Sequence, residues 1–178
     1  QEDVRVQVWT LKVGHATLYL LDTNLIEAPD HHKELTNNLY GMGNGLRIKQ
    51  EILLGIGGIR LLDAIDAHPE VYHLNEGHAA FLIYELWIKK IQEGIQASKA
   101  WHEVCEKCVF TTHTPVPAGH DKFYWNEVNS VLGPYRESLD LPAGTFMNGG
   151  REDLSDLESP LSMTILGLKG SRKANGVS

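Results

Sequence analysis

The spacing of apolar residues along the chain predicts strands first and helices afterwards. Near the N-terminus, Val4, Val6 and Val8 alternate with polar residues, and a second apolar run covers residues 17–21. Both patterns are typical of strands, and residues 13–15 are a suitable turn between them. From Leu46 to Ile65, isoleucine and leucine recur at steps of three and four residues, which predicts a helix.

The second half of the chain repeats this alternation. Residues 71–74 form a short apolar run, and Asn75 has the side chain of a helix N-cap, which predicts a helix from there to about Gly94. A third helical pattern covers residues 98–108, and the strand pattern 109–112 follows it. A last apolar stretch, 161–168, predicts a helix that ends near Ala174. This order favours parallel strands with helical crossovers, and therefore one α/β unit over residues 1–178.

Two polar segments that contain histidine lie directly after predicted strands. Residues 73–78 follow the first strand and residues 111–121 follow the second. Ligands of open parallel sheets bind outside the carboxyl ends of the strands, so both segments are predicted to line one cleft. Each histidine alone is equally compatible with a structural hydrogen bond. Glu76 either complements a helix dipole or offers its carboxylate to a ligand hydroxyl or a neighbouring histidine.

Composition narrows the class of protein. With 42% hydrophobic and 22% charged residues, the 178-residue chain is typical of a soluble globular protein. Its net charge of -7 disfavours nucleic acid as a partner but permits a neutral sugar, or a phosphate in a local positive pocket. The sequence contains no membrane-span pattern and no signal peptide, so we expect no membrane partner and a cytoplasmic location. The first residue is Gln1, and the chain stops soon after a helical pattern, so we expect both ends to be cut.

Two further motifs are ambiguous. Residues 55–58, Gly-Ile-Gly-Gly, resemble a phosphate-binding loop, but they lie inside a helical pattern without a preceding strand, which favours close helix packing. His102, Cys105 and Cys108 recur every three residues, as zinc ligands do, with His113 or His120 available as a fourth ligand. Cysteine is also a common buried apolar residue, and the same spacing fits a packed helix face. We assign no metal site.

Three long motifs carry a resemblance to a known family. Residues 73–81, 110–121 and 171–178 resemble segments that occur in this order in α-glucan phosphorylases, most closely in the shorter bacterial and archaeal branch. Residues 19–23 and 47–58 support the resemblance. It implies a GT-B glycosyltransferase with two Rossmann-like domains, in which this chain is an internal fragment of the N-terminal domain. The implied reaction transfers a terminal glucose from an α-1,4-glucan to phosphate, giving glucose 1-phosphate.

The resemblance also implies partners and a cofactor. Full-length phosphorylases use pyridoxal phosphate, which is bound to a lysine far downstream, and nothing in this chain corresponds to that lysine. The fragment alone is therefore expected to be inactive and to hold no pyridoxal phosphate covalently. Its implied partners are the glucan, phosphate and the remainder of the same polypeptide, and the parent enzyme is expected to be a homo-oligomer.

The site residues follow from the same motifs. By resemblance, His113 is the catalytic residue: it contacts the glucose hydroxymethyl group, and its backbone carbonyl lies near the anomeric carbon. A carbonyl dipole in that place stabilises an oxocarbenium-like transition state. Asn75, Glu76, His78 and Thr112 are the expected substrate-binding residues. Residues 40–45 resemble a mobile gate but lack the acidic residue usual near Gly43, so control through this loop is expected to differ.

Two alternatives remain at this stage. One is a zinc-dependent hydrolase that uses His102, Cys105, Cys108 and His113, and stoichiometric zinc in the purified protein would favour it. The other is a non-catalytic carbohydrate-binding module, which would bind glucan saturably without turnover.

Overall fold

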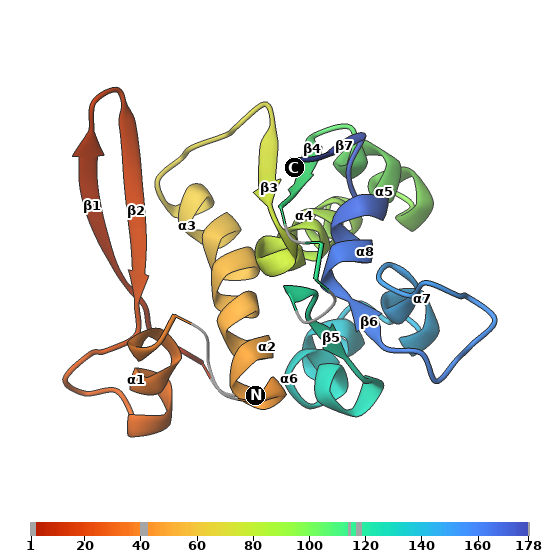
Figure 1. Ribbon diagram of the computed structural model, residues 1–178, viewed down its shortest axis with the longest axis horizontal. Helices are drawn as coiled ribbons and strands as arrows, with labels where there is room; N and C mark the ends of the chain where they lie inside the picture. Colours follow the sequence, from red (N-terminus) through yellow and green to blue (C-terminus); the bar gives the residue numbers. More distant parts are fainter. Residues whose placement is uncertain (1–2, 40–42, 114, 117–118, 178) are drawn as a thin grey trace.

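The computed structural model describes residues 3–39, 43–113, 115–116 and 119–177, and these form a mixed α/β structure (Figure 1). The helices are α1 (Asp30–Asn37), α2 (Asn44–Ile52), α3 (Gly58–Ala64), α4 (Phe81–Gln92), α5 (Ala97–Cys105), α6 (Trp125–Glu137), α7 (Ala143–Asn148) and α8 (Met163–Lys169). The strands are β1 (Gln7–Val13), β2 (Ala16–Asp22), β3 (Tyr72–Asn75), β4 (Cys108–Thr112), β5 (Lys122–Phe123), β6 (Leu161–Ser162) and β7 (Lys173–Gly176). None of these helices has the length and apolar composition needed to cross a membrane.

A three-stranded parallel sheet in the order β3-β4-β7 holds the two histidine-containing segments. Asn75 at the end of β3 lies opposite Thr111 of β4, and Thr111 lies opposite Asn175 of β7. Helices α4 and α5 form the crossover from β3 to β4. The predicted parallel strands and helical connections are therefore confirmed, and the carboxyl ends of all three strands meet at one edge.

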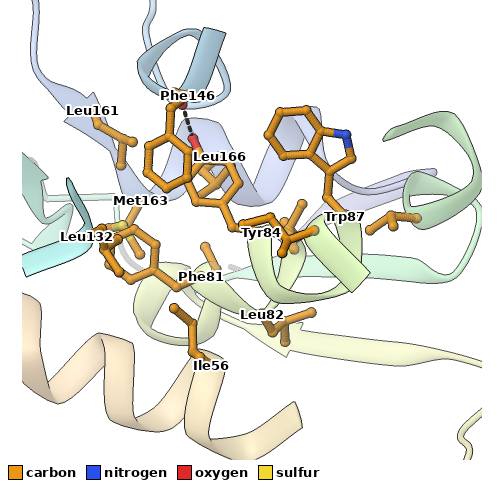
Figure 2. Packing of buried hydrophobic residues seen from close by; sticks show 14 of the residues in the cluster. Ile56, Phe81, Leu82, Tyr84, Trp87, Leu132, Phe146, Leu161, Met163 and Leu166 are labelled. Atoms are coloured by element: carbon orange, nitrogen blue, oxygen red, sulfur yellow. Dashed lines mark hydrogen bonds between the residues drawn. The ribbon is translucent and has the colours of Figure 1, made fainter. Parts of the chain in front are cut away.

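The hydrophobic core surrounds α4, which is buried on nearly all sides. Phe81 and Tyr84 are fully buried, and the Tyr84 ring lies 4.2 Å from that of Phe146, between centroids. Figure 2 shows these rings packed between α4 and α7, where the Tyr84 hydroxyl donates a hydrogen bond to the carbonyl of Phe146. A buried aromatic hydroxyl needs such a partner. The core therefore anchors the helix that follows β3 directly.

A π-helical turn interrupts the helix predicted over residues 46–65. It covers Leu53–Gly57 between α2 and α3 and places Gly55 against the start of α4. A Cβ atom at Gly55 would lie 2.7 Å from the backbone nitrogen of Leu82 and 3.0 Å from the carbonyl oxygen of Ala79. The close-packing interpretation of these glycines is confirmed at Gly55, where a backbone passes too near for a side chain.

Several expected element boundaries are wrong, including that of the helix predicted over 98–108, which ends at Cys105. Asn75 is not a helix N-cap, because pairing with β4 continues through it and the Glu76 N–H donates to the carbonyl of Thr111 at 2.8 Å. A short 3-10 helix, Gly77–Ala79, then precedes α4. At the other end, α8 stops at Lys169, and Lys173–Gly176 forms β7 instead of continuing the helix. In both places backbone hydrogen bonds to β4 outweigh local helix preference.

The hairpin of β1 and β2 extends away from the sheet at the left of Figure 1, and the predicted turn lies at Gly14 and His15. The first strand runs from Gln7 to Val13, later than the alternation of residues 4–8 predicts. Trp9 pairs with Leu20 and Leu11 with Leu18. Cross-strand partners share a face of the hairpin. These four side chains form one apolar face, and each is 46–53% exposed.

We predict that Gly55→Ala destabilises the chain by about 1–3 kcal/mol, because its new methyl group displaces the start of α4. Gly58→Ala is the matched control, since it also lies in the helical run and a Cβ there meets nothing within 4 Å. That control should be neutral or stabilising by up to about 1 kcal/mol. Urea unfolding of both variants measures the difference, and equal effects would contradict this packing argument.

Candidate functional site

The carboxylate of Glu76 joins the ends of β3 and β4. It accepts a hydrogen bond from the backbone N–H of His113, and the Thr112 hydroxyl donates to its Oε2 atom at 3.3 Å. Glu76 is buried and has a backbone φ of 67°. Non-glycine residues adopt that region rarely, and they keep it where surrounding contacts hold them there. The structure thus brings Glu76, Thr112 and His113 together as predicted, with Glu76 fixing the backbone at His113.

A chain of hydrogen bonds crosses the same edge of the sheet. The Thr111 hydroxyl donates to Oδ1 of Asn175 at 2.8 Å, and it lies 2.8 Å from Nε2 of His73. Because one hydroxyl has a single proton, it must accept from His73, whose proton therefore resides on Nε2. These hydrogen bonds join residues of β3, β4 and β7. They lie directly beside Glu76, Thr112 and His113, which we call the Glu76 group.

A second polar group lies on the other side of Gly77. His78 belongs to the 3-10 helix, Arg47 and Glu51 lie one turn apart on α2, and Asp121 immediately precedes β5. Arg47 donates to Oδ2 of Asp121 from Nη2 at 2.9 Å and from Nε at 3.1 Å. The Asp121 carbonyl accepts from the N–H of Met163, which fixes this loop against α8. We call these four residues the Arg47 cluster.

The side chains of the Arg47 cluster lie within hydrogen-bond or ion-pair distance of one another. Nδ1 of His78 lies 2.6 Å from Nη2 of Arg47, 3.4 Å from Oε1 of Glu51 and 3.5 Å from Oδ2 of Asp121. Nη2 of Arg47 also lies 3.3 Å from Oε1 of Glu51. The Glu51 side chain is only 1% exposed, and that of His78 is 30% exposed. His78 and Asp121, whose side chains are 30% and 24% exposed, are therefore the members that a ligand in solution can reach.

Burial and pairing shift three pKa values in this cluster. Burial raises the pKa of Glu51 to about 8. Hydrogen bonds to Asp121 and Glu51 raise the pKa of His78 to about 9. Burial opposes ionisation of Asp121, but hydrogen bonds from His78 and Arg47 outweigh it and hold the pKa of that carboxyl well below its ordinary value. Asp121 and Arg47 thus form a lasting ion pair, and Glu51 is the acid that titrates near neutral pH.

The Arg47 cluster includes the residues most compatible with a metal ion. Within the described part of the chain, only Glu51, His78 and Asp121 bring three ligand atoms within 4.8 Å of one another. The guanidinium of Arg47 already supplies a positive charge among them, so the arrangement fits an ion-pair network better than a cation site.

The structure does not support the zinc alternative. Cys108 is buried in β4, and the Cys105 thiol faces the carbonyl of Lys169 at 3.4 Å. Nδ1 of His120 lies 2.7 Å from the Thr164 hydroxyl, so this histidine is hydrogen bonded to Thr164 and not to a thiol. Neither cysteine belongs to a described group of three metal-binding side chains, so the structure gives no support to a zinc-dependent hydrolase.

Asn75 and the expected gate are the remaining predicted parts of the site. Asn75 ends β3 with an exposed side chain, near but outside the hydrogen bonds of Glu76. Residues 40–42 of the expected gate lie outside the described residues, and α2 begins at Asn44 within the rest of it. Sequence reasoning missed Arg47, Glu51 and Asp121 as site residues. Their only signals were the four-residue spacing of Arg47 and Glu51 in a helical pattern and the position of Asp121 at the end of a motif.

The Glu76 group lies at the carboxyl edge of the parallel sheet, the Arg47 cluster lies on the other side of Gly77, and together they form the candidate site. The chain is 41% identical over 175 residues to maltodextrin phosphorylase of Thermococcus litoralis and 40% identical over 191 residues to glycogen phosphorylase of Mycobacterium tuberculosis. It is 28% identical over 177 residues to glycogen phosphorylase of Aquifex aeolicus. No protein-family model matches the chain.

Each of these comparisons covers 98–99% of the chain but only 20–25% of the relative. The chain therefore spans about a fifth to a quarter of the length of the curated relatives it matches. The resemblance predicted from the motifs is confirmed: nearly the whole chain is similar to one part of maltodextrin and glycogen phosphorylases.

We predict that Glu76→Ala accelerates amide hydrogen exchange at His113, because that N–H loses its charged acceptor. The expected loss of protection corresponds to about 1.5–3 kcal/mol, the range for hydrogen bonds to charged groups. Glu70→Ala, at an exposed position before β3, is the control and should leave exchange at His113 unchanged. Unaltered exchange in Glu76→Ala would show that Glu76 does not hold this backbone.

We predict that the free energy of unfolding falls as the pH rises from about 5 to about 8. Glu51 binds its proton more tightly when folded, with a pKa of about 8 against an ordinary value of 4.5. Its contribution is complete below that ordinary value and is lost as the pH rises through the folded one. Asp121 acts oppositely and loses its contribution in acid. Urea midpoints across this range test the prediction, and a midpoint that rises toward pH 8 would refute it.

Proposed function

We propose that the chain forms the sugar-binding part of an α-1,4-glucan phosphorylase site, as part of the Rossmann-like N-terminal domain of a GT-B enzyme. In the whole enzyme, terminal glucose passes from the glucan to phosphate and gives glucose 1-phosphate. The observation that carries this proposal is the similarity to a maltodextrin phosphorylase along 98% of the chain. Residues 1–178 act in it as one α/β unit.

His113 is the proposed catalytic residue. Its backbone N–H is held by Glu76, which restrains the peptide that enters this position. The side chain is exposed at the strand end and is free to reach a sugar hydroxyl. A carbonyl dipole held beside the anomeric carbon stabilises positive charge as the glycosidic bond breaks, without reorganisation during the reaction. Glu76 acts through His113 and is therefore a positioning residue.

Asn75, Thr112 and His78 are the other proposed substrate contacts. Asn75 and Thr112 end the neighbouring strands β3 and β4, so an amide and a hydroxyl flank Glu76 at the same edge. His78 follows Glu76 after one residue and retains an exposed face. Amide, hydroxyl and imidazole groups both donate and accept hydrogen bonds, which suits the hydroxyl-rich face of a sugar.

The residues of this chain do not fit covalent attachment of pyridoxal phosphate. Neither the Glu76 group nor the Arg47 cluster contains a lysine, and an imine with the cofactor aldehyde needs an amine. We therefore derive no step through the cofactor from these residues, and we propose that other parts of a phosphorylase hold it.

We propose that activity requires the remainder of a phosphorylase polypeptide, because the curated relatives are about five times as long as the matched segment. The apolar face of the β1–β2 hairpin is a suitable contact for that remainder, since about half of each of its four large side chains is exposed. The parent enzyme is proposed to be a cytoplasmic homo-oligomer acting on α-1,4-glucan and phosphate.

The test is phosphorolysis of maltodextrin by the whole enzyme that carries this segment, supplied with pyridoxal phosphate and phosphate. We predict release of glucose 1-phosphate, and a loss of about 10- to 100-fold in kcat/KM for His113→Ala, as expected for one lost hydrogen bond to a bound sugar. His15→Ala, at the exposed hairpin turn, should retain full activity.

Release of no glucose 1-phosphate by the folded, cofactor-loaded enzyme would reject the proposed function. Saturable glucan binding in the same sample would then favour a carbohydrate-binding module. Equal activity of His113→Ala and the parent would reject the contact of the His113 side chain with the sugar, and would leave the reaction and the backbone carbonyl of that position in place.

A further inference from the structure

Glu51 is an unusual carboxyl group for a protein interior. Its side chain is 1% exposed, and its Oε2 atom has no hydrogen-bond partner among the described residues. Its Oε1 atom has long contacts, 3.3 Å to Arg47 and 3.4 Å to His78, and the carboxyl group of Asp121 also interacts with it. A buried ionised carboxylate normally accepts several short hydrogen bonds, whereas a protonated one needs fewer. The surroundings of Glu51 thus favour its neutral form.

The contact between Arg47 and His78 sets the protonation of the histidine. A guanidinium group only donates hydrogen bonds, so a separation of 2.6 Å between its Nη2 and Nδ1 of His78 requires Nδ1 to be an acceptor. The ring is then neutral, and its proton resides on Nε2. The raised pKa of His78 describes the other state, in which the two carboxylates attract a proton to Nδ1. With Arg47 at this distance the two states exclude each other.

These two states differ by the position of one proton. In the first, the Glu51 O–H is intact, His78 is neutral, and Arg47 and Asp121 form the ion pair. In the second, the O–H bond of Glu51 breaks and an N–H bond forms at Nδ1 of His78. The net charge of the cluster is zero in both, since the second has two cations and two anions. Only the first accommodates the short contact between Arg47 and His78.

Three further elements pack against the 3-10 helix that holds His78. The π-helical turn Leu53–Gly57 and strand β3 pack against its 3-10 helix, and His73 of β3 is bonded to Thr111. Helix α8 begins with uncharged residues, and His120 reaches it through the Thr164 hydroxyl. Glu76 directs its carboxylate to the end of β4. Arg47, Glu51 and Asp121 place their charged or titratable groups directly against Nδ1 of His78.

We propose that Glu51 is a positioning residue for His78: it keeps the mobile proton of the Arg47 cluster on its own carboxyl group. His78 consequently remains a neutral ring that presents an Nε2–H donor at the site. The use of that donor toward a sugar hydroxyl rests on the proposed function, whereas the placement of the proton does not. Glu51 lies on α2, which begins within the expected gate at Asn44, so the same helix connects both features (Figure 1).

The direct test is nitrogen-15 NMR of the histidine rings in the 178-residue chain across a pH series. At neutral pH we expect the Nδ1 signal of His78 to be that of an unprotonated ring nitrogen and the Nε2 signal that of an N–H. As the pH rises past about 8, ionisation of Glu51 should move the His78 signals. A protonated Nδ1 at neutral pH in the unaltered chain would overturn the proposal without any variant.

Glu51→Gln keeps the shape of the protonated acid but cannot release its proton. In this variant we expect the inflection near pH 8 to vanish from the His78 signals while the neutral Nε2–H form remains. Glu34→Gln, the same change at an exposed position on α1, should titrate like the unaltered chain. Should Glu51→Gln not fold, Glu51→Asp keeps an ionisable proton and should retain an inflection at a shifted pH. An unchanged inflection in Glu51→Gln would reject the role of Glu51.

A second readout separates this proposal from the proposed function. In the whole enzyme, Glu51→Gln should remove or displace the alkaline limb of the pH profile of kcat/KM, whereas a merely structural loss would lower activity equally at every pH. Loss of phosphorolysis in the unaltered enzyme with the expected NMR result would reject the function and keep the proton assignment. Phosphorolysis by an enzyme in which Nδ1 of His78 is protonated would keep the function and reject the proton assignment.

Discussion

The in-register parallel pairing of β3 and β4 is the constraint on which the rest of the site depends. Because Asn75 lies opposite Thr111, Glu76, the first residue after β3, can reach the backbone of His113 and the hydroxyl of Thr112. A shift of one residue would turn these side chains to opposite faces of the sheet. The backbone of Glu76, at φ 67°, costs about 1–3 kcal/mol, and charge-assisted hydrogen bonds offset this. The register of β3 and β4 and the hydrogen bonds of the Glu76 carboxylate therefore stabilise each other.

Gly77 explains how two polar groups of different character lie so close together. A Cβ atom there would lie 3.0 Å from the backbone of Met163, so only glycine lets α8 approach the turn this closely. On one side of it, Glu76 faces the strand ends, and on the other, His78 faces α2. The first group fixes a backbone, whereas the second holds a titratable ring. Buried ionic groups of the second kind contribute more to a defined geometry than to stability.

Much of this arrangement is predictable from sequence where the determinants are local. The strand and helix patterns, the close approach at Gly55, and the meeting of Glu76, Thr112 and His113 follow from periodicity and from the geometry of parallel sheets. The Arg47 cluster is not predictable in this way, because Arg47 and Asp121 are 74 positions apart and no local pattern pairs them. Asn75 and Lys173–Gly176 were misassigned since their preferences are weak beside the hydrogen bonds that β4 offers. Local chemistry thus indicates which segments meet, and tertiary pairing decides which side chains touch.

The position of β7 at the far edge of the sheet has a consequence for the order of folding. Thr111 of the central strand bonds to Asn175 across 64 positions of sequence, so this edge cannot close until Asn175 has left the ribosome. The β1–β2 hairpin, by contrast, contains only local pairings and can form within microseconds of synthesis. Until β7 arrives, one edge of β4 stays unpaired, and an unpaired edge can pair with another nascent chain. Pairing of β7 therefore completes this edge of the sheet and ends the period in which β4 can pair with another chain.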